Sequence, residues 1–221
     1  TDSGQTVGTR GTFDVELGDL DGDTDLDVWF ANGSTSGDPD EVWLNDGLGN
    51  FTNSGQQIGN DFSFSVVLFK CDGDNDLDAF VGNNTGQPNR LYLNNGSGVF
   101  SDSGQDLGIG GAISAAARDL DGDLDLDLFL ANNTQPEQVF LNDGFCQFTS
   151  SGQILGSNSA EAVALGDIDG DGDRDALVGS YGGISRVFRN DGLGAFTDDD
   201  QWLGGGFGAT VTAVRLADFD G

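Results

Sequence analysis

The chain has 221 residues, with 38 acidic side chains against 8 basic ones and no His, so its formal net charge is −30. A surface of this charge repels phosphate, which argues against nucleic acids and anionic membranes as partners, and no apolar run of 18 residues is present to span a bilayer. Without His, neither a Ser-His-Asp triad nor a His-ligated zinc site can be built. The aromatic residues, which include 16 Phe, are regularly spaced, and this favours a folded chain over a disordered one.

Short apolar runs rich in β-forming residues follow one another from the start of the chain. They predict strands at residues 12–18, 27–31, 41–45 and around Phe51, and then at 65–69, 78–82 and 89–94. The sequence Asn-Asp-Gly after the third of these is a strong hairpin signal, because positive φ is easily adopted there. No segment shows helical periodicity of useful length. The sequence therefore predicts an all-β fold.

Three sequence markers recur with one period. Asp-rich clusters begin at Asp19, Lys70, Asp119, Asp167 and Asp218, which are 51, 49, 48 and 51 residues apart. An Asn-Asp-Gly or Asn-Asn-Gly turn begins at positions 45, 94, 142 and 190, and a Phe-Thr or Phe-Ser pair begins at positions 51, 100, 148 and 196. We therefore treat 1–221 as one array with repeats 1–51, 52–100, 101–148, 149–196 and a partial 197–221. Four short strands per repeat predict a β-propeller of ~49-residue four-stranded blades, and an elongated β-solenoid is the alternative.

The loop between the first two predicted strands of a repeat carries acids at loop positions 1, 3, 5, 7 and 9. Five carboxylates so close together repel one another unless a cation lies among them, and Ca²⁺ accepts six to eight oxygen ligands. We expect side-chain oxygens from positions 1, 3 and 5, the backbone carbonyl of position 7, and a closing carboxylate from position 9. The candidate calcium ligands are Asp19, Asp21, Asp23, Asp25, Asp27, Asp119, Asp121, Asp123, Asp125, Asp127, Asp167, Asp169, Asp171, Asp173 and Asp175.

The Asp-rich loop does not have the sequence of an EF-hand. An EF-hand needs Glu at position 12, where this chain has Phe30, and it needs flanking helices rather than strands. A solvated acidic turn without a metal is the remaining alternative. The second loop differs because Lys70 stands at position 1, before Asp72. We expect Lys70 to reach into this loop and partly replace the cation, so that calcium binds weakly or not at all; the alternative is a Lys70 that points to solvent.

The loop at 119–127 and the segment at 91–100, Leu-Tyr-Leu-Asn-Asn-Gly-Ser-Gly-Val-Phe, resemble the FG-GAP/VCBS repeat of integrin α-like β-propellers. The resemblance covers essentially the whole chain. It implies propeller blades with calcium between the first two strands, in a secreted or cell-surface protein used for adhesion or ligand binding. Some fungal lectins and polysaccharide-active proteins carry similar propellers, so the family does not name the ligand.

The chain departs from this family in its number of repeats, because such propellers usually have seven blades. Its last predicted strand, at 210–217, is followed by an unfinished Asp-rich loop at 218–221. Two interpretations stay open. The sequence is a piece of a longer array, which we favour, or another chain completes the strand in a head-to-tail self-assembly.

Five Asn-x-Ser/Thr sequences are candidate glycosylation sites if the host is a secreting eukaryote. Three of them share one place in the repeat, at the end of the second strand, where we expect surface glycans or turn residues. The five are Asn32, Asn50, Asn83, Asn95 and Asn132.

The cysteines and tryptophans have structural roles in this interpretation. Cys71 replaces a Leu or Ile of the other repeats and is expected to be buried, whereas Cys146 replaces a turn Gly and is expected to be exposed; a disulfide between them stays open. Trp29 and Trp43 lie in predicted strands and are expected to pack, and Trp202, in a Gly-rich stretch, is expected to be exposed.

No enzyme constellation is found in the sequence. Pairs of Asp of the kind that glycosidases use could form, but nearly all candidates belong to the metal loops. We therefore expect a non-enzymatic, extracellular, calcium-binding structural or adhesion module, whose partner is the chain itself or an extracellular protein or glycan. The alternative is a calcium-dependent, lectin-like propeller, and a polysaccharide-active enzyme is the least favoured interpretation.

Overall fold

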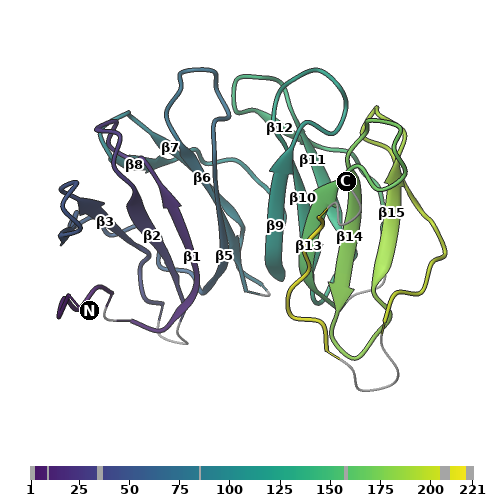
Figure 1. The fold of residues 1–221 in the computed structure, drawn as a ribbon, viewed down its shortest axis with the longest axis horizontal. Helices are drawn as coiled ribbons and strands as arrows, with labels where there is room; N and C mark the ends of the chain where they lie inside the picture. The colour runs from purple at the N-terminus through teal and green to yellow at the C-terminus, as the bar shows by residue number, and fades with distance from the viewer. Residues whose placement is uncertain are drawn as a thin grey trace. The chain divides into compact units, whose positions relative to one another are not determined.

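The computed structural model describes residues 3–8, 10–33, 37–84, 86–156, 159–204 and 210–217. The chain divides into two compact units, Thr1–Gly110 and Gly111–Gly221. Each unit contains two four-stranded antiparallel sheets, and none of the described segments is a helix (Figure 1). These segments accordingly contain no helix that is long and apolar enough to cross a membrane. The all-β prediction is confirmed.

In every sheet the strands are hydrogen-bonded in chain order, from the first to the fourth. The strands of the first unit are β1 (Thr12–Gly18), β2 (Asp27–Asn32), β3 (Glu41–Asn45) and β4 (Phe51–Asn53), then β5 (Ser63–Phe69), β6 (Asp78–Asn83), β7 (Arg90–Asn94) and β8 (Phe100–Asp102). The strands of the second unit are β9 (Ala112–Arg118), β10 (Asp127–Asn132), β11 (Gln138–Asn142) and β12 (Phe148–Ser150), then β13 (Ala160–Gly166), β14 (Asp175–Ser180), β15 (Arg186–Asn190) and β16 (Phe196–Asp198).

The predicted hairpin turns join the third strand of each sheet to the fourth. In the first sheet the Asp46 N–H donates to the Asn50 carbonyl at 3.1 Å, and in the second the Asn95 N–H donates to the Val99 carbonyl at 3.2 Å. Asn-Asp-Gly and Asn-Asn-Gly favour such turns because their Gly adopts positive φ without a steric penalty, and Gly47 has φ 73°. Each sheet is therefore a meander of short strands with the Asp-rich loop between its first two.

Aromatic side chains pack neighbouring sheets together inside each unit. Trp29 of β2 is fully buried, and its ring meets Phe100 of β8 edge to face, with 4.8 Å between the ring centroids. Phe129 of β10 meets Phe196 of β16 in the same way at 5.3 Å. Edge-to-face pairs of this kind contribute about 0.5–1.5 kcal/mol beyond the area that they bury. The second strand of one sheet thus packs on the fourth strand of the next.

A glutamine from the recurring Ser-Gly-Gln sequence also joins neighbouring strands, and we call this arrangement the glutamine clamp. The side chain of Gln56 accepts the Phe100 N–H at 2.9 Å and donates to the Gly98 carbonyl at 2.6 Å. The same pair of bonds joins Gln5 to Phe51 and Gly49, and Gln153 to Phe196 and Gly194. The clamp therefore satisfies the backbone at the start of an outer strand with the side chain of a residue 41 to 46 positions earlier.

The strand predicted at 210–217 is not formed. Thr210 makes one isolated bridge with Tyr181, and residues 211–217 have no strand pairing. The Val211 N–H donates to the Ser180 carbonyl at 3.1 Å, and side chains pack the rest of the segment on its own unit. A Cβ built at Gly166 of β13 would lie 2.9 Å from Leu216 Cδ1, and one built at Gly18 of β1 would lie 3.2 Å from Leu68 Cδ1. Residues 210–217 thus lie against β13 as β5 lies against β1, but beyond this single bridge they lack the ladder of backbone hydrogen bonds that makes a strand.

Three of the five candidate glycosylation sites lie inside the fold. The side chains of Asn32, Asn83 and Asn132 are buried, at 1%, 0% and 1% exposure. Each amide donates to the backbone carbonyl of a proline, and the three acceptors are Pro39, Pro88 and Pro136. The periodic Asn therefore closes the link to the third strand and offers no surface for a glycan. Asn50 and Asn95 do lie exposed at hairpin turns.

The cysteines and tryptophans agree with the sequence predictions except at one position. Trp29 is fully buried, Trp202 is 75% exposed and Cys71 is buried, as expected. Trp43 is partly buried on β3, where its ring N–H donates to Glu41. The exposure predicted for Cys146 is wrong, because this residue is buried at 1% exposure, and neither cysteine is a free thiol.

Candidate metal centres and a polar pocket

Three of the Asp-rich loops bring the carboxylates of positions 1, 3 and 9 together. Within each group, one oxygen from each carboxylate lies within 4.8 Å of the others. The groups are Asp19, Asp21 and Asp27 in the first loop, Asp119, Asp121 and Asp127 in the third, and Asp167, Asp169 and Asp175 in the fourth. Spacing alone pointed to all five acids of each loop, and these three are the ones whose carboxylates the fold brings together.

Position 9 is the buried anchor of each loop. Asp27 is the first residue of β2 and is fully buried. Its Oδ2 accepts the Leu20 N–H at 2.8 Å, and its Oδ1 accepts the Asn45 N–H at 2.8 Å. One carboxylate therefore ties the loop to the end of β3. Asp127 makes the equivalent bonds in the third loop, with Leu120 and Asn142.

Position 1 shapes the loop by accepting two backbone N–H groups. The Oδ1 and Oδ2 of Asp119 accept from Gly122 at 2.8 Å and from Leu124 at 3.2 Å. Both donors have left-handed backbones, with φ 84° and φ 79°. Thr24 has φ 78° at the corresponding place. A non-Gly residue in this region costs about 1–3 kcal/mol, and neither Thr24 nor Leu124 carries a sequence signal that would have predicted it.

Positions 5 and 7 lie outside the carboxylate groups. The position 5 side chain of Asp23 accepts the Asp25 N–H at 2.9 Å. The position 7 carboxylate lies against the Gly of the hairpin turn, and a Cβ built at Gly192 would approach Asp173 Oδ2 to 2.5 Å. The same contact joins Asp25 to Gly47, Asp76 to Gly96 and Asp125 to Gly144. The turn Gly thus has a second role, which is to leave room for this carboxylate.

The electrostatics of these loops favour a bound cation. Burial and the nearby charges of Asp121 and Asp123 raise the pKa of Asp127 to about 6. Burial raises the pKa of Asp121 as well, with the charges of Asp123 and Asp119 adding to it. A divalent cation would stabilise the ionised forms of all three ligands. The donors of each group are carboxylate oxygens, which are the ligands that Ca²⁺ prefers, so the residues present fit this ion.

The second and fourth loops differ from the other two. Lys70 is exposed, and no ion pair among the described residues joins it to a loop carboxylate, so the predicted internal cation of the second loop is not there. In the fourth loop, Arg189 of β15 lies beside the carboxylates instead. Its Nη1 is 3.2 Å from Asp175 Oδ2 and 3.5 Å from Asp169 Oδ2, and its Nε is 2.9 Å from Asp199 Oδ2. The sequence marks this position, because Arg189 stands where the other three repeats have Leu.

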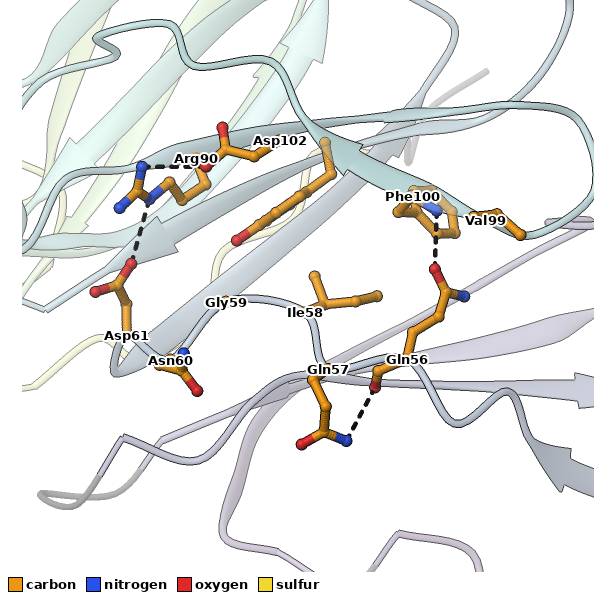
Figure 2. A pocket seen from close by; sticks show the side chains of 11 residues that line it. Gln56, Gln57, Ile58, Gly59, Asn60, Asp61, Arg90, Val99, Phe100 and Asp102 are labelled. Atoms are coloured by element: carbon orange, nitrogen blue, oxygen red, sulfur yellow. Dashed lines mark hydrogen bonds and ion pairs between the residues drawn. The ribbon is translucent and has the colours of Figure 1, made fainter.

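A polar pocket of about 600 Å³ lies in the first unit, between the link that precedes β5 and the strands β7 and β8 (Figure 2). Arg90 lines one side of it, with its Nε 3.3 Å from Asp61 and its Nη1 3.1 Å from Asp102. Tyr92 and Phe100 supply aromatic surface. Burial raises the pKa of the Tyr92 hydroxyl above its usual value, so this group stays protonated and is available as a donor.

A second pocket, of about 370 Å³, occupies the corresponding place in the second unit. An ion pair between Arg186 and Asp198 repeats the pair of Arg90 with Asp102. Phe188 stands in this pocket where Tyr92 stands in the larger one. The two pockets therefore share one architecture, but the smaller one has no tyrosine hydroxyl.

The comparisons with known proteins agree with the fold. Residues 70–130, 119–178 and 167–221 each match the model of the FG-GAP-like repeat. The chain belongs to the FG-GAP-like repeat family. The resemblance predicted from the loop and turn sequences is thereby confirmed, and the four sheets of this FG-GAP-like chain are β-propeller blades.

One solved structure similar to this FG-GAP-like chain is that of an Agrocybe aegerita lectin, described for its specific recognition of non-reducing terminal N-acetylglucosamine. The two share 21% sequence identity with a TM-score of 0.55, and the match covers 82% of this chain and 49% of the lectin. The chain thus spans about half the length of that lectin, and a likeness at this identity shows the fold alone. No curated protein sequence matches the chain.

Proposed function

We propose that this FG-GAP-like chain is a non-enzymatic, calcium-stabilised extracellular repeat module. The observation that carries the proposal is the gathering of three carboxylates at positions 1, 3 and 9 of the loop between the first two strands. In the third loop, Asp119, Asp121 and the fully buried Asp127 would hold the ion. Calcium would neutralise their charges and fix the loop, and calcium is abundant outside cells, where weak sites stay filled.

Calcium should stabilise the folded chain by mass action. An ion that binds only the folded state at 100 times its Kd adds about 2.7 kcal/mol per site. We expect the melting temperature to fall clearly when calcium is replaced by a chelator. The variant Asp121→Asn should lose part of this calcium effect, whereas the exposed Asp106→Asn should keep all of it. Identical melting curves in calcium and in chelator would refute the proposal.

A second candidate function is carbohydrate binding at the pocket of the first unit. The pocket combines Arg90 and two carboxylates, which can bond to sugar hydroxyls, with the rings of Tyr92 and Phe100, which can pack on a sugar face. Its volume of about 600 Å³ is in the range of small-molecule sites.

The described residues 210–217 pack on their own unit, and head-to-tail assembly is therefore not part of the proposal.

Isothermal titration with N-acetylglucosamine, the sugar named for the similar lectin, tests this candidate function, and a glycan array extends the search. We expect Arg90→Met to abolish binding and Tyr92→Phe to weaken it. Arg186→Met in the smaller pocket is the matched control and should bind as the wild type does. Equal binding by the Arg90 and Arg186 variants would place the sugar elsewhere, and an array without any bound glycan would refute the function.

A further inference from the structure

Arg189 lies where the other blades have an aliphatic side chain. The residue before the last Asn of the third strand is Leu44, Leu93 or Leu141 in the other three blades. In the fourth blade this place holds a guanidinium, whose Nη1 lies 3.2 Å from Asp175 Oδ2 and 3.5 Å from Asp169 Oδ2. Two of the three carboxylates that the fourth loop gathers are therefore already in contact with a positive charge.

A second substitution in the same blade holds this guanidinium in place. Asp199 follows β16 at the position of the Ser in the Ser-Gly-Gln sequence of the other repeats, as at Ser151. Its Oδ2 accepts from Arg189 Nε at 2.9 Å. One guanidinium thus bridges Asp199, Asp175 and Asp169, with Asp175 fully buried. The planar guanidinium keeps its charge at all accessible pH values and presents donors to several carboxylates at once.

We propose that Arg189 is the internal cation of the fourth loop, and that this loop takes up no calcium while the first and third loops do. The inference rests on the proposed calcium function and adds a residue that decides which loops are sites. A calcium ion at Asp167, Asp169 and Asp175 would have to displace the guanidinium from two of its ligands. It would then also be repelled by that charge, whereas the leucines of the first and third blades offer no such competition.

Calcium stoichiometry of the full chain tests the proposal, measured by equilibrium dialysis and by native mass spectrometry. Arg189→Leu restores the residue of the other blades and is expected to bind one more calcium ion per chain than the wild type. Arg174→Leu is the matched control, because it removes an exposed charge from the same loop, and Arg174 has no ion pair within the described residues. The control is expected to keep the wild-type number. The proposal is overturned if Arg189→Leu gains no ion, or if both variants gain one.

A ligand variant in the otherwise unchanged chain tests the same point if Arg189→Leu fails to fold. Asp169→Asn is expected to leave the number of bound calcium ions unchanged, because the fourth loop holds none. Asp121→Asn, its counterpart in the third loop, is expected to lose one ion. Loss of an ion on Asp169→Asn overturns the role of Arg189 and leaves the calcium function standing. A wild-type chain that binds no calcium overturns the calcium function itself.

Discussion

Replacing Asp40 with Asn should remove part of the dependence of stability on pH. Asp40 precedes β3 and is 2% exposed. Its Oδ1 accepts the Asn32 N–H at 2.8 Å, and its Oδ2 accepts the Trp29 ring N–H at 3.3 Å. Asn89 holds the corresponding place before β7, where it accepts the Asn83 N–H at 3.0 Å and is also buried. Asp40→Asn therefore gives the first blade the arrangement of the second.

The size of the effect follows from the pKa of Asp40. Burial raises this pKa to about 7 from its ordinary value of 3.8. Between these values the folded state holds a proton that the unfolded state has released, so the free energy of unfolding falls as the pH rises. Between pH 5 and the pKa near 7, the folded state holds one proton more than the unfolded state over about two pH units. Each of these units lowers the free energy of unfolding by about 1.4 kcal/mol, which amounts to about 2–3 kcal/mol by pH 8. Burial also raises the pKa of Glu137 to about 7. This residue is present in both the wild type and Asp40→Asn, so its contribution cancels when the two proteins are compared.

Urea denaturation at pH 5 and pH 8, in chelator so that calcium plays no part, measures this difference. We expect the wild type to lose about 2–3 kcal/mol more than Asp40→Asn between the two pH values. The exposed Asp106→Asn is the control and should lose as much as the wild type. A wild type and an Asp40→Asn variant with the same change from pH 5 to pH 8 would show that Asp40 is ionised throughout, and the argument from its burial would be wrong.

Three further substitutions test the loops, the clamp and the surface, each by denaturant unfolding in chelator. Leu124→Gly should stabilise the chain by about 1 kcal/mol, because Gly adopts φ 79° without strain, and the fourth loop already has a Gly at this place, Gly172 with φ 101°; no gain would show that the loop stores no strain. Gln153→Leu should cost about 1–3 kcal/mol, since it leaves the Phe196 N–H without its side-chain acceptor. Trp202→Ala should change stability by less than about 0.5 kcal/mol, because this ring is 75% exposed, and a larger loss would reveal packing.

The strands could be predicted closely because two independent signals agreed on them. The apolar runs at 12–18 and 41–45 are bounded by the Asp-rich loop and the Asn-Asp-Gly turn, and the observed strands have these same limits. The segment at 210–217 has the apolar run but pairs only through the isolated bridge between Thr210 and Tyr181, and it forms no strand. The apolar pattern therefore predicted strands correctly only where a neighbouring strand was also present to share a full ladder of hydrogen bonds.

The candidate sites were only partly predictable, because they depend on where side chains point. The spacing of acids identified the loops, but the convergence of positions 1, 3 and 9 also needs the left-handed backbone at Thr24 and the buried place of Asp27. The sequon at Asn83 has the sequence of a surface site, and only the structure shows that its amide is used internally. The contacts of Arg189 could not be predicted for the same reason, since the sequence does not say which side of β15 faces the loop.

Because of the glutamine clamp, each clamped blade depends on a residue that precedes its first strand in the sequence. Gln56 follows the last strand of the first blade, yet its bonds go to Gly98 and Phe100 at the outer strand of the second. A duplication of one repeat would thus copy the connector together with the blade that it serves. An array of this kind can gain or lose whole repeats and keep every glutamine clamp intact. A cut between a glutamine and its acceptor strand, in contrast, would leave the two partners of that clamp on different fragments.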